Sequence, residues 1–164
     1  MKKLLAILLT ACLCLTLPIG CSSNKSDSSK KIDPSILADN VLTALAPQAE
    51  LIEVSQNVLS NYYNVDSQVV QAYKIYISSA WTAEEIAVFL LVDDKSSTIE
   101  AAKAMINQRE DALTASFEGY LPEELATLQE NSAVYHQGRI IAFVSGSAEG
   151  VASALTVLRT ACEE

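Results

Sequence analysis

The stretch VVQAYKIYISSAWTAEEIAVFLLV, residues 69–92, decides the fold class. Its first half, residues 69–79, alternates and is rich in β-branched and aromatic side chains. Its second half, residues 85–92, is an almost unbroken apolar run. Both patterns are typical of strands. We therefore predict two strands joined through residues 79–83, with residues 93–96 forming the turn that follows.

Two helical patterns precede this hairpin. Asp33 and Pro34 have the residue types of an N-cap and a first helical position, and Pro47 ends the helix that they open. From Ala49 to Asn64, apolar residues recur at three- and four-residue spacing. This spacing predicts a second, shorter helix.

The longest predicted helix follows the hairpin. Ser97 and Glu100 form the pattern of a capping box at its start, and it ends at residues 119–122. Its apolar residues fall on one stripe at the helical rotation of about 100° per residue. A further turn or two of helix is predicted from Pro122.

A second hairpin and a last helix complete the chain. Residues 132–136 and 139–145 are predicted strands flanking Gln137 and Gly138, and Ser147 can cap the final helix. The sequence therefore predicts an α+β fold. It consists of a small antiparallel sheet made of two hairpins, packed by a long central helix and by N- and C-terminal helices.

Residues 1–20 have the pattern of an export signal. Two lysines precede an apolar run, residues 4–17, that is too short and wrongly flanked for a spanning helix. Gly20 and Cys21 resemble the lipobox of bacterial lipoproteins, in which the chain is cut before a cysteine that carries lipid. We therefore expect cleavage between Gly20 and Cys21 and a diacylglyceryl group on Cys21.

Two alternatives to this anchor stay open. Pro18 occupies the place where the lipobox has an aliphatic residue, and Cys12 fits the short motif better but leaves an apolar run of only about eight residues. Ordinary secretion or retention of the segment is the other alternative. Two acyl chains on Cys21 would anchor the protein stably, since each buried methylene contributes about 0.8 kcal/mol. The predicted location is the outer face of the cell membrane.

The remainder divides into a tether and one domain. Residues 21–33 are rich in serine and lysine and are predicted to be flexible. Residues 34–164 hold six basic and 18 acidic residues, a net charge of −12. This charge disfavours nucleic acid as a partner. The alternative is that the acidic residues serve only solubility.

The cysteines exclude two classes of small protein. Cys12 and Cys14 leave with the signal and Cys21 is lipidated, so Cys162 has no partner within the chain. A disulfide scaffold is excluded, and so is zinc held by paired cysteines. We predict no metal and no cofactor.

Several motifs together resemble a known family. They are Thr82–Phe89, Arg109, Phe117 with Tyr120 and Pro122, and Gly138 before an apolar strand. Over residues 34–146 the chain resembles an uncharacterised domain-of-unknown-function family of small Gram-positive lipoproteins. The resemblance implies a lipid-anchored single domain and brings no reaction, ligand or catalytic residue.

Glu85 and Arg109 are the first candidate site. Glu85 shares a sheet face with Ala87 and Phe89, and Arg109 flanks the apolar stripe of the long helix. We expect the two side chains to lie near each other, either as a structural ion pair or as a recognition site for a polar ligand.

Trp81 and Tyr120 are the second candidate site, a contact surface. Trp81 lies in a polar loop at the tip of the first hairpin. An exposed tryptophan often marks such a surface, whereas folding over the sheet edge is the structural alternative. Tyr120 is one of six tyrosines that either line a groove or occupy the margins of sheet and helices.

No residue is predicted to be catalytic. His136, beside a hairpin turn, is expected to be exposed, and Cys162 is expected in a helix core. The sequence therefore favours a non-enzymatic lipoprotein that binds an envelope protein or a cell-wall ligand. The alternative is an envelope hydrolase that uses acidic residues such as the neighbouring pairs Glu84–Glu85 and Glu123–Glu124.

Overall fold

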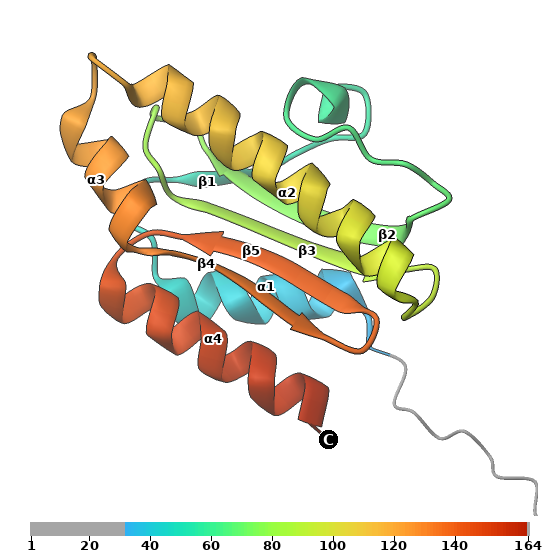
Figure 1. The fold of residues 1–164 in the computed structure, drawn as a ribbon. Helices are drawn as coiled ribbons and strands as arrows, with labels where there is room; N and C mark the ends of the chain where they lie inside the picture. Colours follow the sequence, from blue (N-terminus) through green and yellow to red (C-terminus); the bar gives the residue numbers. More distant parts are fainter. Residues whose placement is uncertain (1–31, 164) are drawn as a thin grey trace, which may run out of the picture.

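A computed structural model describes residues 32–163, which form one five-stranded antiparallel sheet with helices on both faces (Figure 1). The strand order is β1-β2-β3-β5-β4. Helices α1 and α4 cover one face, and α2 crosses the other. The elements in chain order are α1 (Pro34–Leu45), β1 (Leu51–Glu53), the 3-10 turn η1 (Leu59–Asn61), β2 (Val70–Ser78), β3 (Glu85–Leu91), α2 (Ser96–Phe117), α3 (Pro122–Glu130), β4 (Ser132–Gln137), β5 (Ile140–Ser145) and α4 (Ala148–Glu163).

The predicted α+β class is confirmed, with α2 as the long central helix and with flanking helices from both ends of the chain. The Asp33 carboxylate accepts a bond of 2.8 Å from the Ser35 amide, as expected of the N-cap of α1. The two hairpins join through β3 and β5, whose pairing runs from Glu85 opposite Ser145 to Leu90 opposite Ile140. The signal, Gly20, Cys21 and the tether up to Lys31 lie outside the described residues.

The helix predicted from Ala49 to Asn64 is wrong. Residues 51–53 instead form β1, which pairs with the end of β2, and the amide of Val54 donates to the carbonyl of Ile75 at 2.9 Å. Leu59 and Tyr63 are buried under α2. The apolar spacing is therefore satisfied by a sheet edge and a buried turn, because pairing with β2 overrides a weak helical preference.

The predicted capping box at Ser97 and Glu100 is also wrong. Helix α2 begins at Ser96 without a side-chain cap. The Asp93 carboxylate accepts bonds from the Thr98 hydroxyl at 2.6 Å and the Lys95 amide at 3.2 Å, so it holds the first turn instead. The turn between β4 and β5 contains Gly138, whose φ of +54° requires glycine, but it lies one residue later than predicted.

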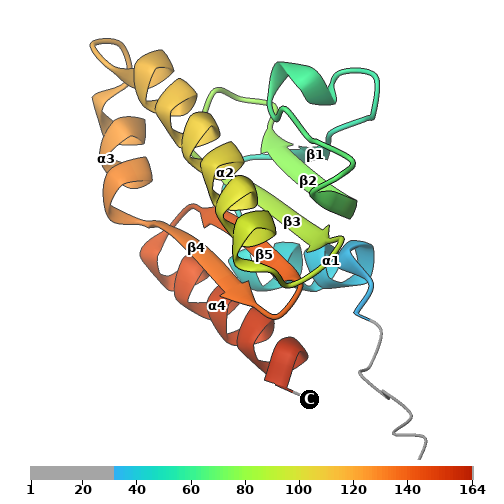
Figure 2. The same cartoon turned by 45° about the vertical axis from the view of Figure 1, so that its right-hand side comes forward.

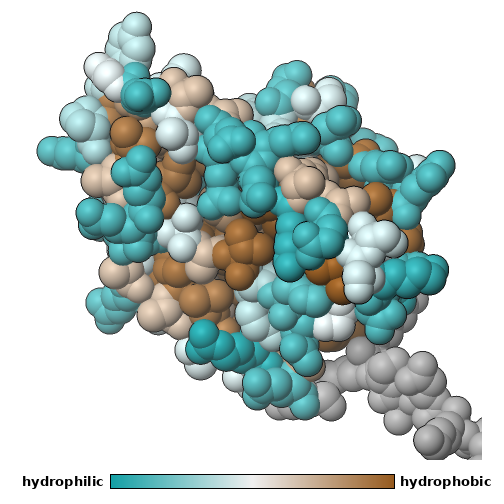
Figure 3. Space-filling model, viewed as in Figure 1, coloured by the Kyte–Doolittle hydropathy of each residue, from teal (hydrophilic) through white to brown (hydrophobic). Residues whose placement is uncertain are grey.

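The sheet separates two apolar clusters. The buried strand residues that α1 and α4 cover are Ile86, Val88, Ile140, Ala142 and Val144. The cluster under α2 includes Ala87, Phe89, Ile141 and Phe143, with Ile106, Leu113 and Phe117 from the helix. Figure 3 shows that the outer surface of α2 is mostly hydrophilic, whereas apolar residues gather between α2 and α4, over the β4 and β5 side of this face.

The chain enters the domain far from the loop between β2 and β3. In Figures 1 and 2 the chain enters α1 at the lower right, and the β2–β3 loop lies at the opposite, upper end of the sheet. The nine residues of β2 span roughly 30 Å at about 3.3 Å per residue. The half-buried Ile32 packs against the α1 and α4 cluster.

Candidate functional site

A pocket of about 400 Å³ opens where the β2–β3 loop meets α2 and β1. We call it the α2-face pocket. Its volume lies within the roughly 300–1,000 Å³ of sites for small molecules. The lining residues are Ile52, Tyr62, Ile77, Ser78, Ser79, Trp81, Thr82, Glu85, Arg109, Leu113, Ser116 and Phe117.

Glu85 and Arg109 lie together in this pocket, as the sequence predicted. Arg109 Nη2 lies 2.6 Å from Glu85 Oε2, and Nε lies 3.1 Å from both carboxylate oxygens. Glu85 is only 2% exposed. The guanidinium also lies 5.2 Å from the centre of the Tyr62 ring. The structure thus brings the pair together, and whether it serves structure or recognition stays a prediction.

Tyr63 completes the hydrogen bonding of Glu85. Its hydroxyl donates to Glu85 Oε1 at 2.6 Å, and the residue is buried. Burial raises the pKa of Tyr63 well above its ordinary value, and the Glu85 charge raises it further. The phenol therefore keeps its proton and remains a donor. The carboxylate is held by one cation and one hydroxyl.

Trp81 stands exposed beside this pair. Its side chain is 74% exposed, and its backbone has a φ of +48°. The amide of Ser79, two residues before Trp81, donates to the Glu50 carbonyl at 3.0 Å, which connects the loop to the segment before β1. Left-handed backbone costs a non-glycine residue roughly 1–2 kcal/mol. Because the side chain is exposed, its burial offsets little of that cost. Trp81 therefore does not fold over the sheet edge, which was the structural alternative.

Thr82 adds a second unfavourable feature to the loop. Its hydroxyl oxygen is buried and has no hydrogen-bond partner among the described residues. A buried polar group left without a partner costs about 1–3 kcal/mol. Thr82 lines both the α2-face pocket and a second pocket next to it. Two successive loop residues therefore lower stability where the pocket opens.

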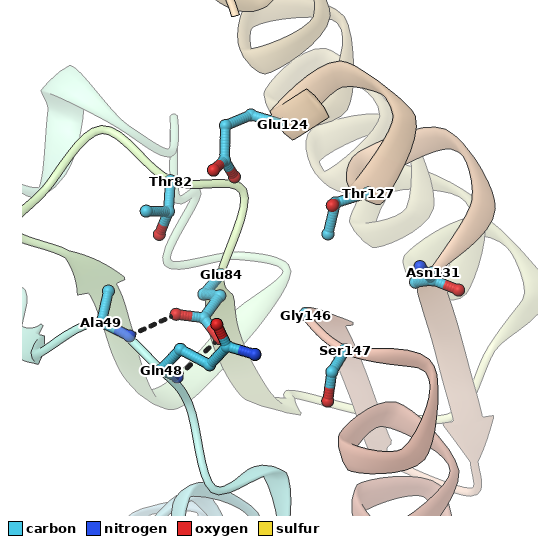
Figure 4. A pocket seen from close by; sticks show the side chains of 9 residues that line it. All are labelled: Gln48, Ala49, Thr82, Glu84, Glu124, Thr127, Asn131, Gly146 and Ser147. Atoms are coloured by element: carbon cyan, nitrogen blue, oxygen red, sulfur yellow. Dashed lines mark hydrogen bonds between the residues drawn. The ribbon is translucent and has the colours of Figure 1, made fainter. Parts of the chain in front are cut away.

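The second pocket, of about 360 Å³, is shown in Figure 4. Glu84 in this pocket accepts bonds from the amides of Gln48 at 2.8 Å and Ala49 at 2.7 Å. Glu124 of α3 accepts from the Ala83 amide at 2.7 Å. In the figure these carboxylates lie on either side of Thr82. Both therefore anchor backbone, and they fix the loop that carries Trp81.

The other candidate residues lie outside the α2-face pocket. Tyr120 is 85% exposed beyond the end of α2 and does not line it. His136, expected to be exposed, is half-buried, with its ring nitrogen 3.0 Å from the Gly138 carbonyl. The half-buried Cys162 packs against the α1 and α4 cluster, and burial raises the pKa of its thiol. Trp81 thus lines the pocket and Tyr120 does not, and a contact surface that includes both stays a prediction.

The wall that α2 contributes was not foreseen from the sequence. Arg109, Leu113 and Phe117 are four residues apart, which places them on one helix face. This spacing was a usable signal. Ile52 was missed because the apolar spacing of its segment favours a helix. In the structure Ile52 lies in β1 and pairs with Ile77 of β2.

Metal-binding clusters and membrane-spanning helices are both absent from residues 32–163. No three side chains of the types that bind metal come together within this range. None of its helices combines the length and the apolar character needed to cross a membrane.

Comparison with known proteins finds one family. The model of the family described as Domain of unknown function (DUF4358) matches residues 46–146, more than half of the chain. Every residue that lines the α2-face pocket lies within this range. No curated protein and no solved structure matches the chain.

Proposed function

The chain belongs to the DUF4358 family, a domain of unknown function, and we propose that this member is a lipid-anchored binding protein on the outer face of the cell membrane. Its anchor is a diacylglyceryl group on Cys21. Its domain binds a ligand of the cell envelope in the α2-face pocket. The protein acts by binding and carries out no reaction.

The place where the chain enters supports this orientation. The segment from Cys21 leads to α1, whose first residue lies at the end of the sheet opposite the β2–β3 loop. An anchored domain can therefore turn Trp81 away from the membrane. The pocket then faces the outer envelope, where a ligand can reach it.

The single observation that carries the proposal is Trp81. The side chain is exposed, the backbone is strained, and it stands at the mouth of a pocket of suitable volume. Residues with strained backbone cluster at functional sites. Tryptophan is also the residue type most enriched among the energetically dominant residues of binding surfaces.

The hydrolase alternative has less support. Glu84 accepts two backbone bonds and Glu124 accepts one. Glu85 is engaged by Arg109 and Tyr63. A catalytic acid or base needs a proton that can move to the substrate, and these three carboxylates already have fixed partners. The geometry therefore favours binding over hydrolysis.

Photocrosslinking on intact cells tests the proposal. A photoreactive amino acid replaces Ser116, an exposed residue of α2 that lines the pocket. We expect an adduct with envelope material that is lost when Trp81→Ala is added. The matched control, Tyr120→Ala, removes an exposed aromatic residue outside the pocket and should leave the adduct unchanged. An adduct that forms equally well in Trp81→Ala would contradict the assigned site.

Mass spectrometry of the purified protein tests the anchor separately. We expect the chain to begin at residue 21 with lipid on the Cys21 sulfur. A chain that still begins at Met1, or an unmodified thiol at residue 21, would contradict the anchor without affecting the assignment of the pocket.

A further inference from the structure

We propose that the ligand of the α2-face pocket is a neutral saccharide, whose ring stacks on the indole of Trp81 and whose hydroxyls bond to the pocket wall. This inference rests on the proposed function and adds the chemical class of the ligand. It follows from the flat aromatic side chain, the hydroxyl-bearing wall and the charge balance of the same pocket.

The mouth of the pocket offers one apolar plane. Trp81 is 74% exposed and thus presents most of its indole to solvent. A pyranose ring has a face of C–H groups that fits such a plane, while its hydroxyls point outward around the rim. Aromatic side chains of this amphipathic kind combine a large contact area with a polar edge.

The wall carries hydroxyls in suitable states. The Ser79 hydroxyl donates to the Glu50 carbonyl at 3.2 Å, and the Ser116 hydroxyl donates to the Ala112 carbonyl at 2.7 Å. A hydroxyl that donates its proton still has lone pairs that accept. These two oxygens can therefore accept protons from the hydroxyls of a sugar.

Arg109 supplies a complementary donor. Among the described residues, Arg109 bonds through Nε and Nη2 and makes no hydrogen bond through Nη1. The protons of Nη1 can therefore be donated to a ligand oxygen. A saccharide, in which every hydroxyl can both donate and accept, matches this mixture of donors and acceptors.

The charges of the pocket favour a neutral ligand. Glu85 and Arg109 are the charged residues of the lining, and they neutralise each other at 2.6 Å. A cationic ligand would find no uncommitted carboxylate in this lining. An anionic ligand would approach a domain whose residues 34–164 carry a net charge of −12. Neither sign of charge is favoured.

The only tryptophan of the chain, Trp81, reports directly on this site. The experiment measures its fluorescence in the full-length protein, held in a detergent without a sugar head group. The probes are neutral oligosaccharides, namely cellohexaose and chitohexaose. We expect a saturable change of emission with at least one of them. No saturable change at millimolar concentrations of both would overturn the proposal.

Two variants separate hydrogen bonding from simple contact. Ser79→Ala removes one of the accepting hydroxyls of the wall, so saccharide affinity should fall about three- to tenfold, the effect of one hydrogen bond. Tyr120→Ala should leave the affinity unchanged. Equal affinity in Ser79→Ala and the wild type, or a loss of affinity in Tyr120→Ala, would place the saccharide elsewhere and overturn the proposal.

Two other probes decide between ligand classes. Polyphosphate and a lysine-rich peptide are titrated in the same way, and neither should alter the emission saturably. Binding of either one without binding of the oligosaccharides would overturn the saccharide assignment. The cell-surface adduct at Ser116 would still depend on Trp81 in that case, so the proposed function would stand. An adduct at Ser116 that does not depend on Trp81 would contradict both the proposed function and the saccharide assignment.

Discussion

The two faces of the sheet are packed by helices of similar kind, yet their chemistry differs. The buried strand residues under α1 and α4 are entirely apolar. Under α2, Glu85 is buried with Arg109 and Tyr63 as partners. The alternation of β3 produces this contrast within one strand, because Glu85 faces α2 while the adjacent Ile86 faces α1.

The buried ion pair distinguishes the two faces in what their buried groups contribute to stability. Buried apolar contacts stabilise a fold directly, at roughly 25 cal/mol per Å² of apolar surface removed from water. A buried ion pair gives little net stability, because desolvation offsets the attraction of its charges. Both faces therefore stabilise the domain through buried apolar contacts, and the α2 face in addition buries an ion pair. Where the α2 face forms its pocket, the buried pair of Glu85 and Arg109 adds little net stability.

The largest expected effect comes from breaking the ion pair. Arg109→Ala leaves the charge of Glu85 buried and uncompensated, so the free energy of unfolding should fall by about 3–5 kcal/mol. The measurement is equilibrium unfolding in denaturant. Arg159→Ala, which removes an exposed arginine of α4, is the matched control and should change stability by less than about 0.5 kcal/mol. Similar results for the two variants would refute the buried pair.

The opposite face should respond differently. Leu158→Ala removes a fully buried side chain of α4, so stability should fall by about 2–5 kcal/mol. At temperatures where this variant is folded, its adduct at Ser116 should equal that of the wild type. A lost adduct in the folded variant would show that the two faces do not differ in function.

A third variant makes the α2 face resemble the other one. Combining Glu85→Leu, Arg109→Met and Tyr63→Phe removes every partner of the network at once. Apolar replacement of a whole buried pair is often neutral or stabilising, so the triple variant should regain most of the stability that Arg109→Ala loses. Saccharide binding should still be lost. A triple variant less stable than Arg109→Ala alone would mean that the ion pair holds the α2 face together.

A smaller effect depends on pH. Glu110 is half-buried on α2, and burial raises the pKa of its carboxyl above the ordinary value of 4.5. The folded protein thus binds this proton more tightly, and the stability that it contributes is lost as the pH rises from 4.5 through the raised pKa. Glu110→Gln cannot titrate there. Its stability relative to the wild type should therefore increase over this window and then level off, and a constant difference in unfolding experiments would refute the shift.

The sequence predicted those parts that depend on strong local patterns. Alternation identified β2, an almost unbroken apolar run identified β3, and the assignment of sheet and helix faces correctly placed Glu85 near Arg109. Strand β1 was missed because three residues carry too little pattern to compete with helical spacing. The left-handed backbone of Trp81 could not be predicted either, because a residue of this type rarely adopts it.

Trp81→Gly tests most directly whether this residue is kept for binding. Glycine accepts a φ of +48° without strain, and little buried surface is lost. Circular dichroism during denaturation should therefore show stability equal to the wild type or up to about 1 kcal/mol higher. Ala46, the other non-glycine residue with a positive φ within residues 32–163, provides the control: Ala46→Gly should give a similar gain and keep the adduct at Ser116. A loss of stability in Trp81→Gly as large as that of Leu158→Ala would show that the indole is structural and would contradict the account.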